Sequence, residues 1–157
     1  DEGKEIRAIF CDISKAFDRV WHAGLLVKLE SIGISGNLLN WFKDYLSNRK
    51  QSVVISGHKS SQTSVLAGVP QGSVLGPLLF LIYINDLTNG IVSNIKLFAD
   101  DTSLYLVIED PLQTQTLLNS DLGRISKWAN EWQVKFSPEK TKSVLFFQKK
   151  TVSTKQN

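Results

Sequence analysis

Two adjacent aspartates between two strand-forming runs constrain the fold more than any other stretch of the chain. Asp100 and Asp101 follow residues 94–99 and precede residues 102–108, and both runs are rich in β-branched, aromatic and aliphatic side chains. A two-residue connection between such runs predicts a tight β-hairpin with both carboxylates at its tip. Like charges repel, and a bound divalent cation would remove that repulsion. The alternative is a polar turn, in which aspartate is common.

A second apolar run also ends at a carboxylate. Residues 5–12 predict a buried strand, and a period of two places four of its side chains on one face: Ile6, Ala8, Phe10 and Asp12. Burial of the terminal carboxylate costs free energy unless it is paired or bound to a metal. The alternative is an aspartate that caps the following turn.

The composition is that of one ordinary globular domain. With 157 residues, 42% of them hydrophobic, the chain is long enough to bury a core. The single cysteine, Cys11, excludes an internal disulfide and, with only two histidines, offers no zinc-ligand cluster. The longest apolar run, residues 78–84, is too short to span a bilayer, so we expect no membrane partner. A formal charge of +3 permits an anionic partner without requiring one.

Hydrophobic spacing predicts four helices among short strands. The helices are residues 22–32, a helix capped by Ser35 that reaches Leu46, the apolar segment 78–84, and a helix opened by Asp110 and Pro111. The further strands are 50–56 and 61–67, joined by 57–60, and the short strands 133–136 and 142–148. The loop 68–77 holds three glycines and two prolines, which predicts a defined backbone path. We therefore expect an α+β fold, with an antiparallel sheet that carries the carboxylates and packs on helices.

Four motifs in this order resemble the palm domain of a reverse transcriptase. They are FCDISKAFD at 10–18, GVPQGSVLGP at 68–77, FADD at 98–101 and SPEKT at 137–141. The type is that of retrotransposons without long terminal repeats, and jockey-like mobile elements are the most similar. Three carboxylates at two strand ends also suit a two-metal phosphoryl-transfer site. The resemblance implies a polymerase palm.

The resemblance implies the metal ligands and catalytic groups. Asp12 and Asp100 would hold both metal ions, Asp101 would be a weaker ligand, and the carbonyl of Ile13 would face a metal. Lys140 resembles the lysine that protonates the leaving pyrophosphate. Two Mg²⁺ ions are the implied cofactors, with Mn²⁺ as a substitute.

The resemblance also implies the groups that contact the nucleotide. Phe17 would lie under the incoming sugar as an aromatic gate that excludes a 2′-hydroxyl. Gln71 and Gly72 would line the nucleotide and template pocket. Asp18 is expected to make a structural hydrogen bond and to bind no metal. The chain departs from the family at Ser137, where asparagine is frequent.

The implied function is RNA-directed DNA polymerisation during retrotransposition. The enzyme would add deoxynucleotides to a DNA primer on an RNA or DNA template, inside a ribonucleoprotein of the nucleus or cytoplasm. We expect residues 1–150 to be a palm fragment without fingers, thumb or endonuclease, followed by a disordered tail, 151–157. We expect these residues alone to bind primer–template weakly and to polymerise poorly or not at all. The sequence predicts no oligomeric state.

Three other functions remain open on the sequence. An RNA-dependent RNA polymerase shares the Asp-Asp hairpin, although the bulky Phe17 argues against acceptance of a 2′-hydroxyl. A group II intron maturase is a closer relative. A catalytically inactive RNA-binding or scaffold domain is the third alternative, and the intact carboxylates argue against it.

Overall fold

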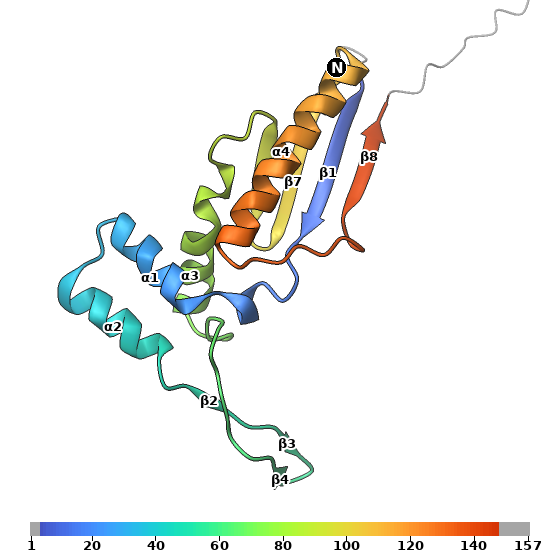
Figure 1. The fold of residues 1–157 in the computed structure, drawn as a ribbon. Coiled ribbons are helices and arrows are strands. Elements are labelled where there is room, and N and C mark those ends of the chain that lie inside the picture. The colour runs from blue at the N-terminus through green and yellow to red at the C-terminus, as the bar shows by residue number, and fades with distance from the viewer. Residues whose placement is uncertain (1–3, 148–157) are drawn as a thin grey trace, which may run out of the picture.

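A four-stranded antiparallel sheet carries the carboxylates in the computed structural model, which describes residues 4–147 (Figure 1). Its strands, in spatial order, are β6 (Asn94–Phe98), β7 (Asp101–Val107), β1 (Ile6–Asp12) and β8 (Lys142–Phe146). Neighbouring strands are antiparallel throughout. The predicted α+β class and antiparallel sheet are confirmed.

The helix α4 (Pro111–Glu131) covers one face of this sheet, as Figure 1 shows. Its N-terminus has the predicted cap, because Asp110 Oδ1 accepts a hydrogen bond from the Gln113 amide at 2.9 Å. A buried cluster joins the helix to the sheet through Ile9, Cys11, Leu104, Leu118 and Ile125. The opposite face of β1, which carries Asp12, is more open than predicted, since Phe10 is 40% exposed.

Three helices form a second core beside the sheet. They are α1 (His22–Ser31), α2 (Gly36–Leu46) and α3 (Leu75–Ile84), and a 3₁₀ turn, Asn85–Thr88, follows α3. The predicted helix 78–84 begins three residues earlier, and Pro77 lies in its first turn, where no intrahelical N–H is needed. Although α3 is apolar all round, it is buried on one face only, because Leu78 and Leu81 are about half exposed.

A buried lysine connects α1, α3 and α4. Lys28 Nζ donates hydrogen bonds to the Tyr83 carbonyl and to Asp86 Oδ1, each at 2.5 Å. The same ammonium lies 3.9 Å from the centroid of the Trp132 ring and 4.7 Å from that of Trp128. Burial lowers the pKa of Lys28, and the hydrogen bond to Asp86 opposes that change. The sequence pattern gave no sign of this cluster.

Residues 49–65 form a narrow hairpin, here called the arm, that extends away from the sheet and helices (Figure 1). It consists of two short ladders: β2 (Lys50–Gln51) with β5 (Thr63–Ser64), and β3 (Val54–Ile55) with β4 (His58–Lys59). Its turn is Ser56 and Gly57, at φ +50° and +81°, rather than the predicted residues 57–60. Two consecutive left-handed residues are what a two-residue hairpin turn of type I′ requires.

The C-terminal segment is less regular than the sequence predicts. The expected strand 133–136 reduces to one bridge between Ile13 and Phe136. The strand expected over 142–148 is present as β8, and its last predicted residue lies outside the described residues, as does the expected tail 151–157. Within 4–147, no helix is both long and apolar enough to cross a membrane.

Candidate active site

The turn of the carboxylate hairpin is Ala99 and Asp100, one residue earlier than predicted. Phe98 pairs with Asp101, so Asp101 is the first residue of β7 and not part of the turn. Ala99 adopts φ +51°, a left-handed conformation that costs an L-residue about 1–2 kcal/mol. The alternation of strand residues is equally compatible with either turn, so the sequence pattern could not fix this register.

Strand pairing brings the three aspartates to one end of the sheet. Asp12 and Asp101 are direct partners in the β1–β7 register, and the Ile13 amide donates a hydrogen bond to the Asp100 carbonyl at 3.4 Å. Asp100 and Ile13 are therefore backbone neighbours beyond the paired residues. In the described part of the chain, however, no three histidine, cysteine or acidic side chains form a ready-made metal cluster.

Lys140 pairs with Asp12 across the end of β1. Its Nζ lies 3.0 Å from Asp12 Oδ2, a buried oxygen that accepts no other hydrogen bond from the described residues. The hydrogen bond to Asp12 and the charge of that carboxylate raise the pKa of Lys140. Hard carboxylate oxygens, one of them buried and satisfied by a cation alone, fit a divalent metal ion. The carboxylates Asp12, Asp100 and Asp101 could therefore hold such an ion, and Lys140 would lie beside it.

Backbone hydrogen bonds hold the lysine turn against β1. The Ser137 amide donates to the Asp12 carbonyl at 2.9 Å, and the Ser14 amide donates to the Lys135 carbonyl at 2.7 Å. Because Ser137 contacts Asp12 through its main chain, this particular bond does not need the asparagine that is frequent in the family. The distant motifs 10–18 and 137–141 thus meet at the carboxylates.

Phe17 lies in a 3₁₀ turn, Phe17–Arg19, beside α3. Its ring centroid is 4.6 Å from that of Phe80, and its carbonyl accepts a hydrogen bond from the Val69 amide at 2.8 Å. Gly68 allows this approach, since a Cβ there would lie 2.8 Å from the Asp18 carbonyl oxygen. The expected gate residue is therefore fixed between the glycine-rich loop and the helical core.

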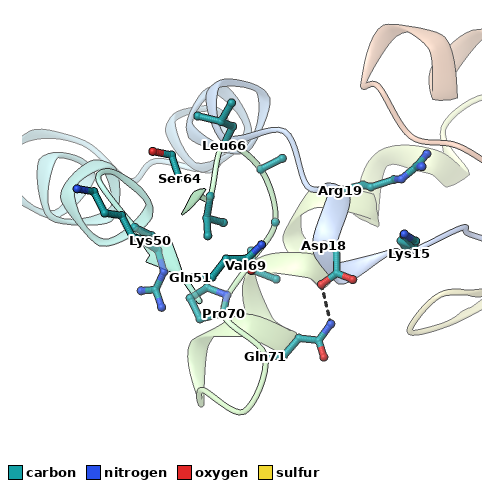
Figure 2. Close-up of a pocket in the computed structure, with 14 residues that line it drawn as sticks. Lys15, Asp18, Arg19, Lys50, Gln51, Ser64, Leu66, Val69, Pro70 and Gln71 are labelled. Carbon is teal, nitrogen blue, oxygen red and sulfur yellow. Dashed lines mark hydrogen bonds between the residues drawn. The ribbon is translucent and has the colours of Figure 1, made fainter. Parts of the chain in front are cut away.

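Gln71 and Asp18 meet at the edge of a pocket of about 790 Å³ (Figure 2). Gln71 Nε2 donates a hydrogen bond to Asp18 Oδ1 at 2.8 Å, which is the structural role expected for Asp18. Gly72, at φ +77°, is not among the described residues that line this pocket. The motif therefore contributes Gln71 to the pocket wall, and Gly72 serves the turn beside it.

Four basic residues line the same pocket, and sequence reasoning missed them. Lys15 and Arg19 come from the segment that follows β1, and Lys50 comes from the base of the arm (Figure 2). Arg49, which precedes Lys50, also lines the pocket. Asp18 is the acidic residue of the lining, and Gln71 already bonds to it. The pocket is therefore electropositive and suits an anion such as a phosphate group. One signal in the sequence could have found it, namely the absence of acidic residues between Asp44 and Asp86.

The sequence profile described as "Reverse transcriptase (RNA-dependent DNA polymerase)" matches residues 1–155. The chain belongs to this family. The RNA-directed DNA polymerase from the mobile element jockey of Drosophila melanogaster is 37% identical to it over an alignment of 145 residues that covers 87% of this chain. The probable RNA-directed DNA polymerase from transposon X-element of the same organism is 33% identical over 93% of this chain. The chain spans 16% of the length of each of these relatives.

A solved structure supports the fold. Apo telomerase from Candida tropicalis, truncated from its C-terminal domain, superposes with a TM-score of 0.67 at 14% sequence identity. The match covers 94% of this chain and 32% of the telomerase chain. The reverse transcriptase chain described here thus has the palm fold of a polymerase. The family generally uses divalent metal ions.

Proposed function

We propose that this chain is the palm of an RNA-directed DNA polymerase that adds deoxynucleotides to a primer 3′-hydroxyl. The observation that carries the proposal is the pairing of Asp12 with Asp101, with Asp100 bonded to Ile13 and Lys140 beside Asp12. Family membership and the names of the relatives support it. The template would be RNA or DNA, and the setting would be retrotransposition within a ribonucleoprotein of the nucleus or cytoplasm.

The residues of the site divide the chemistry among them. Asp12, Asp100 and the Ile13 carbonyl would hold two Mg²⁺ ions, or Mn²⁺ in their place, with Asp101 as a weaker ligand. Such ions, when bound, promote attack by the 3′-hydroxyl and stabilise the leaving oxygen. Lys140 carries a proton beside Asp12, from where it can protonate the leaving pyrophosphate. Phe17, fixed against Phe80, would exclude a 2′-hydroxyl from the incoming sugar.

The protein that acts as the polymerase is longer than the palm. We propose that residues 1–150 are its palm, and that fingers and thumb supply much of the phosphate contact on which nucleic-acid affinity depends. Primer extension by the 157 residues alone should therefore be weak or absent. Equal extension rates from this chain and from a longer natural chain that contains it would contradict the proposal that fingers and thumb supply much of the phosphate contact.

Primer extension by that longer chain tests the proposed function. Asp100→Asn should reduce the extension rate by roughly a hundredfold or more, because a metal-bound oxyanion is worth several kcal/mol in the transition state. Asp110→Asn is the matched control and should extend normally, since asparagine caps α4 as well as aspartate does. Extension by Asp100→Asn at the unchanged rate would reject the assignment.

The same assay distinguishes the proposed DNA polymerase from the alternative, an RNA-dependent RNA polymerase. Phe17→Ala should raise ribonucleotide incorporation relative to deoxynucleotide incorporation, because the ring that excludes the 2′-hydroxyl is removed. An unchanged ratio of ribonucleotide to deoxynucleotide incorporation would show that Phe17 does not exclude the 2′-hydroxyl. Failure of every variant, together with the unmodified chain, to extend a primer would favour an inactive RNA-binding domain.

A further inference from the structure

His22 is the first residue of α1, and its imidazole reaches the glycine-rich loop. The Nε2 atom lies 2.7 Å from the Gly68 carbonyl oxygen, although the two residues are 46 positions apart in the sequence. A carbonyl oxygen only accepts hydrogen bonds, so Nε2 carries the hydrogen and donates it. The helix holds the imidazole in place, because Leu25 of its first turn is fully buried and donates its amide hydrogen to the Trp21 carbonyl at 2.9 Å.

The acceptor of this bond belongs to the peptide plane between Gly68 and Val69. In the same plane, the Val69 amide donates a hydrogen bond to the Phe17 carbonyl at 2.8 Å. The plane is therefore bound at both ends, at its oxygen by His22 and at its nitrogen by Phe17. Because a peptide group is rigid, a rotation at one end breaks the bond at the other.

Gly68 is the residue at which this plane could rotate. It adopts φ +93°, and a Cβ there would lie 2.8 Å from the Asp18 carbonyl oxygen, so the position requires glycine. Glycine reaches backbone conformations that other residues cannot, and the plane that follows it rotates easily unless its polar groups are bound. Rotation would withdraw the Val69 amide from the Phe17 carbonyl. The hydrogen bond from His22 opposes that rotation.

The turn that carries Phe17 depends on the loop for its position. Phe17–Arg19 is a single 3₁₀ turn without a side-chain cap, and such short turns have weak hydrogen bonds of their own. The loop supplies bonds from outside, from the Val69 amide to the Phe17 carbonyl and from the Gly68 amide to the Val20 carbonyl, each at 2.8 Å. The orientation of the loop therefore sets where the Phe17 ring lies.

We propose that His22 is a positioning residue for the selection of deoxyribose over ribose. By holding the peptide between Gly68 and Val69, its imidazole keeps the Phe17 ring where a 2′-hydroxyl would meet it. This role rests on the proposed function, in which Phe17 is the gate. Loss of the imidazole donor weakens the gate without abolishing it, because the Phe17 ring also packs on Phe80.

Primer extension and hydrogen exchange, both on the longer natural chain that contains the palm, test this inference. His22→Phe keeps an aromatic ring but removes the donor, and should raise the ratio of ribonucleotide to deoxynucleotide incorporation about two- to tenfold, the factor that one net hydrogen bond represents. Mass spectrometry should show faster amide exchange of residues 66–71 by a similar factor. His22→Gln should restore both values, because its side-chain nitrogen can occupy the place of the imidazole Nε2.

Three further variants are controls. His22→Asn has the same amide donor on a side chain that is one carbon shorter, and should behave like His22→Phe. In a Phe17→Ala background, His22→Phe should add little to the incorporation ratio, because no ring remains to be positioned. His58→Phe makes the same substitution at an exposed histidine of the arm, and should change neither the ratio nor the exchange. Far-ultraviolet circular dichroism establishes that all variants are folded.

Three results would overturn the inference. If His22→Gln and His22→Asn give the same incorporation ratio, the position of the donor has no influence on the gate. If His22→Phe raises the ratio equally with and without the Phe17 ring, His22 does not act through Phe17. If His22→Phe leaves the exchange of residues 66–71 unchanged, the inference fails whether or not the chain extends a primer. Failure of the proposed function is a separate result, unimpaired primer extension by Asp100→Asn.

Discussion

Ala99 occupies the most strained position of the carboxylate hairpin. Its φ of +51° suits glycine, and Asp100 follows it directly. Ala99→Gly should raise the free energy of unfolding by about 0.5–1 kcal/mol, because relief of the left-handed strain exceeds the entropy that glycine adds to the unfolded chain. Chemical denaturation would measure the change. Ala99→Val should instead destabilise the chain, since a β-branched residue is disfavoured at positive φ.

An alanine in a helix provides the control of opposite sign. Ala129 is buried in α4, where Ala129→Gly should lower the stability by about 1 kcal/mol or more through the loss of helix propensity and packing. If both substitutions by glycine destabilise the chain equally, the backbone at Ala99 is not strained, and the turn adopts a different conformation.

At the scale of helices and strands, Asp121 connects α4 to the segment that leads into β6. It is fully buried, and its carboxylate accepts hydrogen bonds from the amides of Val92 and Ser93, from the Ser93 hydroxyl and from Arg124. Burial alone would raise the pKa of Asp121, but these hydrogen bonds together hold it below its ordinary value. The helix therefore fixes the start of the strand whose other end carries the Asp100 turn.

Asp121→Asn should lower the free energy of unfolding by about 2–4 kcal/mol, because an amide presents donors to groups that are themselves donors. Since the pKa is lower in the folded state, the stabilisation is complete above the unfolded pKa, near 3.9, and is lost as the pH falls through the folded value. Denaturation at pH 7 measures the change, with Asp110→Asn on the same helix as the control. Equal stabilities of the two variants would show that the network carries little free energy.

The elements that the sequence predicted well are those with local signals. Asp110 and Pro111 mark the start of α4 because a cap and a first-turn proline act within four residues. The turn at Ala99 and the turn at Gly57 were each misplaced, because a period of two does not show where the strands stop pairing. The contact of Asp121 with Val92 and Ser93 gave no signal in the sequence, since these partners lie 29 and 28 residues away.

The site was predictable to a similar extent. The carboxylates were found because each ends or precedes an apolar run, and strand pairing then brings Asp12 opposite Asp101. The basic pocket was not found, because Arg19 and Arg49 approach each other only through the packing of the glycine-rich loop against the segment after β1. Contacts between distant segments are set by tertiary structure, which no local pattern encodes.

At the scale of the whole molecule, two hydrophobic clusters meet along one boundary. The first lies among α1, α2 and α3, and the second lies between α4 and the sheet. Trp128 and Phe136 pack against both clusters, and Lys28 and Tyr83 lie on the helical side of this boundary. Because the clusters share side chains, we expect the palm to unfold as one cooperative unit. A charge introduced at the boundary should then destabilise the entire domain.

Tyr83 makes this expectation testable through pH. The side chain is fully buried, its hydroxyl donates a hydrogen bond to the Trp132 carbonyl, and burial raises its pKa to about 12. In the unfolded chain a tyrosine loses its proton near pH 10. Between about pH 10 and 12 the folded state therefore keeps a proton that the unfolded state has lost, and stability falls as the pH rises.

The lowered pKa of Lys28 has the opposite effect on stability, which it raises as the pH rises, because the unfolded chain then holds a proton that the folded chain has lost. This effect ends near pH 10.4, where an unfolded lysine also loses its proton. Above that pH the loss from Tyr83 is unopposed by Lys28 and should amount to roughly 1–3 kcal/mol in denaturation experiments. Tyr83→Phe should be about 1 kcal/mol less stable at pH 7, through the lost hydrogen bond, and should lose less stability between about pH 10 and 12 than the unmodified chain. The part of the alkaline loss that comes from the buried Cys11 thiol, whose pKa is also raised by burial, should remain. Tyr45→Phe, which leaves Tyr83 in place, should show the same alkaline loss of stability as the unmodified chain. An alkaline loss of equal size in both variants would mean that the raised pKa of Tyr83 is not its source.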